Sequence, residues 1–180
     1  MAQIKKRPLF LGIAAAAAVI CLIAALGLLY FALNISNEDS DGLVGSSAPD
    51  FNLPSLNGKS LSLEELHGKP VLLNFWATWC QPCLAEMPLL DATAQTHLGN
   101  LVIVGVNEGD LLADVQSFVK RERLGYPVLL DYDEQVGNLY RLSGYPTSVF
   151  IDAEGIIRAI YLGEIPPEQL KKNLRLIGIE

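Results

Sequence analysis

The stretch Trp76-Ala77-Thr78-Trp79-Cys80-Gln81-Pro82-Cys83 joins an apolar segment, residues 71–75, to a helix-like segment that begins near Leu84. The first cysteine lies at the helix N-terminus, where unpaired N–H groups and the helix dipole favour a thiolate. The second lies one helical turn further on, close enough to close a small disulfide ring. Pro82 fits the first turn, because an N–H group there would have no partner. We interpret Cys80 and Cys83 as a redox-active pair.

Other interpretations of the pair are weaker. Two buried structural cysteines would not need the flanking tryptophan or the proline between them. A zinc site needs about four ligands, and the only histidines, His67 and His97, show no ligand spacing. A static disulfide closing so tight a ring would constrain little of the unfolded chain. We therefore expect no metal and no cofactor.

The first 33 residues predict a membrane anchor. Residues 1–8 are basic, and residues 9–33 form an uncharged, nearly unbroken apolar run. As a helix at about 1.5 Å per residue, this run would span roughly 37 Å, enough to cross a ~30 Å hydrocarbon core with some tilt. By the positive-inside rule, the N-terminus stays in the cytoplasm. We therefore expect a single-pass protein of the cell membrane whose larger part is extracytoplasmic, on the periplasmic or outer face.

Two other fates of this segment compete with an uncleaved signal-anchor. A signal peptide has an apolar region of about 7–15 residues, shorter than this run, and no convincing small-x-small site follows Leu33. Cys21 suggests a lipid-modified cysteine, but the bulky Ile20 precedes it and Cys21 lies in the middle of the run. Cys21 is better explained as a small apolar residue of the membrane helix.

The chain beyond the basic N-terminus is acidic. Removing Lys5, Lys6 and Arg7 from the 13 basic residues leaves 10 against 20 acidic ones, a formal charge of −10. This charge argues against nucleic acid or anionic headgroups as partners. Outside the apolar run, the only cysteines are the C-x-x-C pair. An outward-facing dithiol lies where disulfides persist, so a dedicated electron source is needed to keep it reduced.

The remaining chain predicts a linker and one domain. Residues 34–47 are polar, with glycine and serine, and indicate a flexible linker. Residues 48–180 alternate short apolar strands with helical periodicity, which predicts an α/β fold with a mixed β-sheet flanked by helices. The expected strands are 50–53, 59–63, 71–76, 101–106, 128–130, 147–151 and 156–162, and the expected helices are 81–98, 111–123, 134–141 and 166–177. The first two strands form a β-hairpin across an Asn57-Gly58 turn.

This order of elements resembles the thioredoxin fold and, more narrowly, the membrane-anchored TlpA/ResA-type thiol-disulfide oxidoreductases, which include the cytochrome c maturation reductases. The resemblance covers residues 48–180. Four features carry it: the C-x-x-C stretch, Pro88 five residues after the second cysteine, a Gly144-Tyr145-Pro146-Thr147 segment similar to the family's cis-proline loop, and an inserted strand–helix unit before that loop.

In this family the cis-proline loop packs against the cysteines and pairs with the substrate through main-chain hydrogen bonds. The resemblance therefore implies that Tyr145, Pro146 and Thr147 shape the active site and bind substrate. An ordinary turn proline is the alternative, although cis X-Pro bonds are uncommon without a reason.

The residues around the cysteines are expected to tune the site. Trp76 and Trp79 are expected mainly to pack, and Trp79 also to shape the substrate surface. The Gln81-Pro82 dipeptide tunes the reduction potential in a direction that the sequence does not give.

Proton transfer is expected at Glu86. Asn74 stands where thioredoxin has a buried aspartate, and an amide cannot titrate. Glu86 lies one turn after Cys83 and matches an acidic residue near the active site of ResA-like proteins. A partly buried carboxylate there would have a raised pKa and could exchange a proton with a leaving thiol. The alternative is a surface helix residue. We take Cys80, Cys83 and Glu86 as the expected catalytic residues.

These features predict an extracytoplasmic thiol-disulfide oxidoreductase. Cys80 as thiolate attacks a disulfide of a partner protein, and Cys83 resolves the mixed disulfide. The resemblance implies that the partners are disulfide-containing extracytoplasmic proteins, with the haem-site cysteines of apocytochrome c as one substrate. It also implies a membrane electron donor of the CcdA/DsbD type.

Two other functions fit the sequence less well. Peroxiredoxin-like peroxidases have proline seven residues and threonine or serine three residues before the attacking cysteine, where this chain has Leu73 and Ala77. Copper-binding or copper-delivery proteins of this fold have C-x-x-x-C and a later histidine. This chain has C-x-x-C and no histidine after His97.

Overall fold

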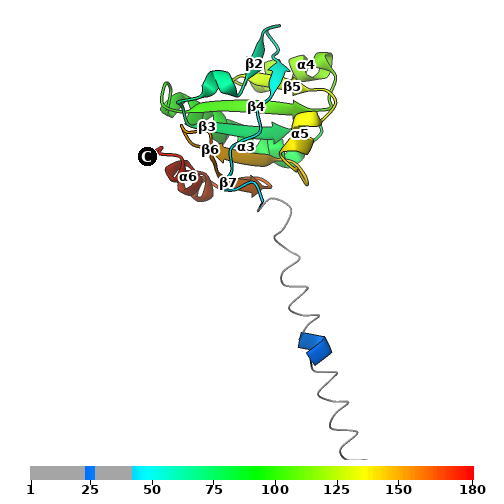
Figure 1. The fold of residues 1–180 in the computed structure, drawn as a ribbon. Helices are drawn as coiled ribbons and strands as arrows, with labels where there is room; N and C mark the ends of the chain where they lie inside the picture. The colour runs from blue at the N-terminus through cyan, green and yellow to red at the C-terminus, as the bar shows by residue number, and fades with distance from the viewer. Residues whose placement is uncertain (1–22, 27–41) are drawn as a thin grey trace, which may run out of the picture. The chain divides into compact units, whose positions relative to one another are not determined.

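The computed structural model describes residues 23–26 and 42–180 (Figure 1). The chain divides into two units, Met1–Glu38 and Asp39–Glu180. In the first unit, residues 23–26 are helical. The rest of the expected anchor, residues 9–33, lies outside the described residues. Among the residues that are described, none belongs to a helix with the length and apolar character needed to cross a membrane.

Five strands of the second unit form one mixed sheet in the order β5-β4-β3-β6-β7 (Figure 1). They are β3 (Val71–Trp76), β4 (Val102–Glu108), β5 (Val128–Asp131), β6 (Thr147–Ile151) and β7 (Ile157–Leu162). β3, β4 and β5 are parallel, whereas β6 runs antiparallel to both β3 and β7. The carboxyl ends of β3, β4, β5 and β7 and the start of β6 therefore share one edge of the sheet, called here the active-site edge.

An N-terminal β-hairpin covers the end strand β5, as the sequence predicts. β1 (Asn52–Pro54) and β2 (Ser60–Ser62) pair antiparallel in a sheet of their own. Ser55 bridges to Leu129 of β5, and the N–H of Leu56 donates to the carbonyl of Val128 at 3.3 Å. The hairpin thereby occupies backbone groups of an edge strand that would otherwise be open to another chain.

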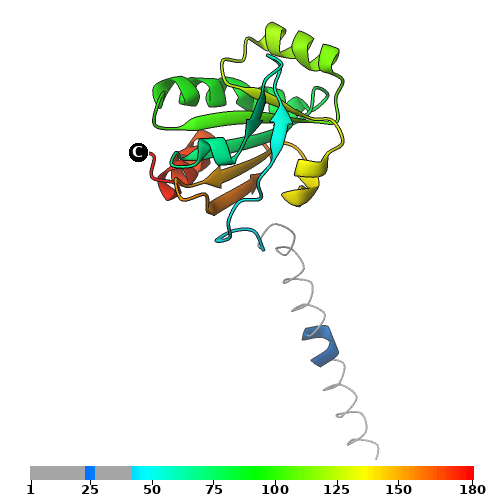
Figure 2. The same ribbon diagram turned by 45° about the horizontal axis from the view of Figure 1, so that its top comes forward.

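Helices cover both faces of the sheet (Figures 1 and 2). The helices α3 (Gln81–Thr96), α4 (Leu112–Glu122) and α6 (Pro167–Leu176) pack on one face, and α5 (Gln135–Leu139) and the short η2 (Glu64–Leu66) pack on the other. All six residues of β3 are buried. Because successive strand residues point to opposite faces, Leu73 and Phe75 join the cluster under α5, whereas Leu72 and Trp76 join the clusters under α3, α4 and α6. The central strand β3 therefore contributes side chains to the hydrophobic clusters on both faces of the sheet.

The expected elements are all present, with small shifts at their ends. The segment α4–β5–α5 lies between β4 and β6 and matches the expected insertion. β4 continues two residues past Val106, through Asn107 and Glu108. Both of these polar side chains are buried. The sequence pattern ends at Val106 because it follows apolar residues only.

Residues 42–47, assigned to the linker from sequence, contact the folded unit. Leu43 is 8% exposed and packs in the cluster under α5. The N–H of Gly45 donates to the carbonyl of Ile157 at 2.8 Å, and Ser47 bridges to Ile156. Leu43 is an apolar residue inside a polar stretch, and its burial starts the folded unit before Ala48.

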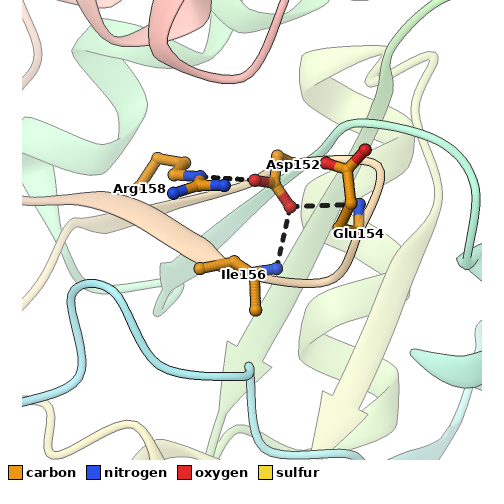
Figure 3. Close-up of polar contacts among 4 residues, drawn as sticks. All are labelled: Asp152, Glu154, Ile156 and Arg158. Carbon is orange, nitrogen blue, oxygen red and sulfur yellow. Dashed lines mark hydrogen bonds and ion pairs between the residues drawn. The ribbon is translucent and has the colours of Figure 1, made fainter.

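The turn between β6 and β7 is fixed by one carboxylate (Figure 3). One oxygen of Asp152 accepts the backbone N–H groups of Glu154 and Ile156 at 3.0 and 2.9 Å, and the other is paired with the guanidinium of Arg158. Burial opposes ionisation, yet these donors hold the pKa of Asp152 below its usual value. The hairpin expected across residues 152–155 is therefore present, at the edge of the sheet opposite the active-site edge.

Candidate active site

The two cysteines lie where β3 gives way to α3. Cys80 is the N-cap residue of α3, and its Sγ accepts the backbone N–H of Cys83 at 3.2 Å. Cys80 and Cys83 form a disulfide, with their Cα atoms 5.3 Å apart. Gln81 and Pro82 are exposed residues of the first helical turn. The geometry is that of a sulfur pair closed across one turn at a helix N-terminus.

The two sulfurs differ in access, and so do the two tryptophans. Cys83 is fully buried, whereas Cys80 retains 4% exposure. Trp76 packs in the core, with its ring 4.8 Å from that of Phe118. Trp79 was expected mainly to pack, but its side chain is 68% exposed. Its ring contacts the ring of Tyr145 edge-on, with 5.9 Å between the ring centroids. β3 ends at Trp76, so Trp79 belongs to the loop that leaves the sheet.

The loop before β6 has the expected cis peptide, between Tyr145 and Pro146. The carbonyl of Pro146 accepts the N–H of Gly163 at 2.8 Å, which ties the loop to the end of β7. Thr147 is 3% exposed, and its hydroxyl donates to the carbonyl of Gly144 at 2.7 Å. The Thr147 side chain therefore braces the loop from inside, while Tyr145 is the side chain of this loop that reaches Trp79.

Glu86 is buried inside the protein. It is 2% exposed and accepts two hydrogen bonds, from Nδ2 of Asn74 at 2.7 Å and from the N–H of Ile165 at 2.8 Å. Burial raises the pKa of Glu86 to about 7, although these two donors pull the pKa in the opposite direction. The carboxyl group is therefore present in both protonation states near neutral pH, one helical turn after Cys83.

The ends of β4 and β5 also bury a pair of acidic residues that the sequence pattern does not predict. Glu108 and Asp131 are register partners at the ends of β4 and β5, and they are 3% and 1% exposed. Asp131 accepts the N–H groups of Val136 and Gly137 at the start of α5, at 2.7 and 3.0 Å. Within residues 42–180, neither oxygen of Glu108 has a hydrogen-bond partner. A Cβ at Gly137 would lie 2.2 Å from Oε2 of Glu108, so only glycine leaves room for this side chain.

Burial, and then the nearby carboxyl of Asp131, raise the pKa of Glu108 to about 9. Glu108 therefore keeps its proton at neutral pH. The same region raises the pKa of Tyr145 to about 12, through burial and then the carboxyl groups of Glu108, Glu134 and Asp131. The available sequence signal was an acidic residue within two positions of the end of each of two apolar strands.

Exposed apolar side chains gather along the active-site edge. Trp79 follows β3, Leu111 follows β4, Tyr132 follows β5, and Leu162 ends β7, and these side chains are 49–71% exposed. Parallel strand directions bring these positions to the same edge as the disulfide. Over the part of the chain that the structure describes, no group of three or more His, Cys, Asp or Glu side chains is arranged to hold a metal ion.

Comparison with known proteins gives consistent matches. Residues 44–160 match the AhpC/TSA family. The chain is 38% identical over 160 residues to the thiol-disulfide oxidoreductase ResA of Geobacillus thermodenitrificans, covering 88% of this chain and 91% of that protein. It is 37% identical over 177 residues to ResA of Bacillus subtilis, covering 96% of this chain and 95% of that protein.

Solved structures give the same picture. A thioredoxin-family thiol:disulfide interchange protein from Chlorobium tepidum matches with a TM-score of 0.66 at 29% identity, over 73% of this chain and 94% of that chain. StoA from Bacillus subtilis matches with a TM-score of 0.61 at 27% identity, over 70% of this chain and 96% of that chain. The predicted thioredoxin-like fold is confirmed.

Replacing Glu108 with Gln should reduce the loss of stability at alkaline pH. The pKa of Glu108 is raised from 4.5 to about 9, so its contribution to stability is present below pH 4.5 and is lost as the pH rises towards 9. Between pH 5 and pH 9, the free energy of unfolding should fall by on the order of 5 kcal/mol more in the wild type than in the variant, at about 1.4 kcal/mol per pH unit. Urea unfolding followed by tryptophan fluorescence at several pH values measures this.

The exposed Glu168, in the first turn of α6, is the control, because Glu168→Gln removes a carboxylate that water already solvates. A stability difference between Glu108→Gln and wild type that stays constant from pH 5 to pH 9 would contradict the assignment.

Proposed function

We propose that this chain, which belongs to the AhpC/TSA family and within it to the ResA-type thiol-disulfide oxidoreductases, reduces disulfide bonds of partner proteins outside the cytoplasm. The single observation that carries the dithiol mechanism is the Cys80–Cys83 disulfide at the N-terminus of α3, beside the cis Tyr145–Pro146 loop. The printed names of the relatives support the same chemistry.

The proposed cycle begins with the reduced protein. The Cys80 thiolate attacks one sulfur of a partner disulfide, which forms a mixed disulfide and releases the other partner sulfur as a thiolate. Cys83 then attacks the sulfur of Cys80, which releases the second partner sulfur. The partner gains two electrons and two protons, and this chain is left with the Cys80–Cys83 disulfide. The helix N-terminus supports the first step because it stabilises negative charge on Cys80.

Glu86 is proposed to move the proton of Cys83. Its carboxylate accepts the Cys83 proton when that thiol must become nucleophilic, and its protonated form returns one when the Cys83 thiolate leaves during re-reduction. A pKa of about 7 suits both directions at neutral pH. Asn74 positions the group through its amide, since it cannot titrate itself.

The proposed partners follow from the surface and from the resemblance. An extended segment of a partner protein would pair with the backbone of the cis-proline loop and lie against the exposed Trp79 and Tyr145. Disulfide-containing extracytoplasmic proteins are the proposed substrates, among them apocytochrome c with oxidised haem-site cysteines. A membrane electron donor of the CcdA/DsbD type is proposed to reduce the Cys80–Cys83 disulfide after each turnover.

The proposed location is the cell membrane. Residues 9–33 serve in this proposal as an uncleaved single-pass anchor with residues 1–8 in the cytoplasm, because the apolar run is long enough and its basic flank lies on the N-terminal side. The peroxidase and copper-binding functions are not proposed, because the named relatives are thiol-disulfide oxidoreductases.

Replacing Cys83 with Ser should trap the partner. Cys80 can still attack, but no second thiol resolves the mixed disulfide, so covalent complexes should accumulate in the membrane fraction. Non-reducing gels followed by mass spectrometry identify the bound proteins. Cys80→Ser is the matched control and should trap none. Recovery of no disulfide-linked protein from the Cys83→Ser variant would remove the substrate claim.

Replacing Glu86 with Gln should change the pH profile of disulfide exchange. The wild-type rate should rise through a midpoint near pH 7, and the variant should lose this inflection and react about tenfold more slowly at pH 7.5. Stopped-flow fluorescence with insulin as the substrate measures both. Glu168→Gln, at an exposed site in the first turn of α6, is the control. Identical profiles for wild type and Glu86→Gln would rule out the proton-transfer role.

An epitope tag placed after Glu180 tests the location. Protease added outside spheroplasts should remove the tag while a cytoplasmic marker stays intact, because the positive-inside rule puts the C-terminus outside. A tag that is cut only after detergent lysis would place the folded unit in the cytoplasm and refute the proposed topology.

A further inference from the structure

Asp110 ties the loop that carries Cys80 to the end of β4. One of its oxygens, Oδ2, accepts the backbone N–H of Thr78 at 2.6 Å. The same oxygen accepts Nδ2 of Asn107 at 2.8 Å. Asn107 is 1% exposed, and its Nδ2 also approaches the carbonyl oxygen of Trp76 at 3.4 Å. The two side chains therefore hold the loop at two points, immediately ahead of the attacking sulfur.

The chain turns sharply to bring Asp110 to this position. β4 ends at Glu108, and Gly109 follows with a φ of +71°, a conformation that favours glycine. The N–H of Gly109 donates to the carbonyl of Asp131 at 3.0 Å, which fixes the turn on β5. A Cβ at position 109 would also lie 2.7 Å from Oε1 of Glu134. The bond to β5 thus holds the turn, glycine leaves room for Glu134 beside it, and Asp110 is directed at the end of β3.

The loop itself is a tight turn with its other end on α3. The N–H of Cys80 donates to the carbonyl of Ala77 at 3.1 Å, and the Sγ of Cys80 accepts the N–H of Cys83. Asp110 therefore binds the start of this turn at Thr78, and α3 binds its end at Cys80. The position of the Cys80 sulfur therefore depends on a contact from a different strand as well as on α3.

We propose that Asp110 is a positioning residue for the dithiol: its carboxylate fixes the loop ahead of Cys80, and its negative charge limits how much of the Cys80 thiol ionises. This inference rests on the proposed role of Cys80 as the attacking sulfur. The N-terminus of α3 favours the thiolate, and a like charge nearby opposes it. A dithiol whose thiolate is held back is a stronger reductant, because its reduced form is less stabilised.

Other groups also face this edge, but their contacts differ. No hydrogen bond in the described part of the chain links any of them to the loop ahead of Cys80, and neither of the two ion pairs there includes Asp110. They come from α3, from the ends of β4 and β5, from the start of α5 and from the cis-proline loop, and they are Glu86, Glu108, Asp131, Glu134 and Tyr145.

Two substitutions separate charge from position. Asp110→Asn keeps an oxygen that can accept the N–H of Thr78 and removes the charge, whereas Asp110→Ala removes both. The reduced full-length protein is titrated by thiolate absorbance and by the rate of Cys80 alkylation against pH. Asp110→Asn should lower the pH of half-ionisation of Cys80 by about 0.5–1 unit, which raises its thiolate fraction at pH 7 about three- to tenfold.

The same variants should also differ in redox balance and rate. In glutathione buffers of fixed ratio, Asp110→Asn should hold a larger fraction of dithiol than wild type, because the variant is the weaker reductant. Asp110→Ala should show this shift and, in addition, exchange disulfides about tenfold more slowly at a pH where Cys80 is fully ionised, since the loop has lost its anchor.

Asp91 offers a matched control. It lies on α3, and its Oδ1 accepts the backbone N–H of Gly125 at 2.8 Å, so it also ties two elements through a carboxylate. Asp91→Asn should leave the Cys80 titration and the glutathione equilibrium unchanged. A wild-type titration curve in Asp110→Asn, or an equal shift in Asp91→Asn, would overturn the proposal.

Failure of the proposed function has a different signature. In that case the Cys83→Ser variant traps no partner protein, while the Cys80 titration still responds to Asp110.

Discussion

The active site depends on Cys80 occupying the N-cap of α3 directly after the central strand. β3 is buried along its whole length and cannot shift without disturbing the cores on both faces. This fixes where the loop leaves the sheet. The N-cap conformation then presents the sulfur to the N–H of Cys83, one turn away. The distance that permits the disulfide is therefore a property of the strand–helix junction, and the side chains around it adjust what the sulfurs do.

Three carboxyl groups near this junction are accommodated in three different ways. Glu86 is buried with two donors and has a pKa near neutrality. Glu108 is buried beside the carboxyl group of Asp131, so it holds its proton. Asp110 is half-buried and accepts two N–H groups from the loop and from β4. All three side chains carry a carboxyl group, so the differences in their protonation and contacts follow from how deeply each is buried and which hydrogen-bond donors surround it.

Much of this arrangement could be predicted from the sequence. The C-x-x-C pair was expected from its place at a strand–helix junction, and the cis-proline loop and a partly buried Glu86 were expected from the resemblance to ResA-type proteins. Glu108 and Asp110 were not singled out, since their environments come from β5 and from the loop after β3, which no local pattern reports. Trp79 was expected mainly to pack because it is large and apolar, yet its loop position leaves it exposed. Thr147 was expected to shape the active site and bind substrate, and its hydroxyl donates to the carbonyl of Gly144 within the loop.

The full burial of Cys83 in the disulfide form has a consequence for turnover. Cys80 is the more exposed of the two sulfurs, so in the proposed cycle the electron donor would attack the same sulfur that attacks the oxidised partner. In the proposed cycle, the electron donor and the oxidised partner would therefore react at the same sulfur, one after the other. Because both would react at this sulfur, the redox state of Cys80 and Cys83 would determine which of the two proteins can react.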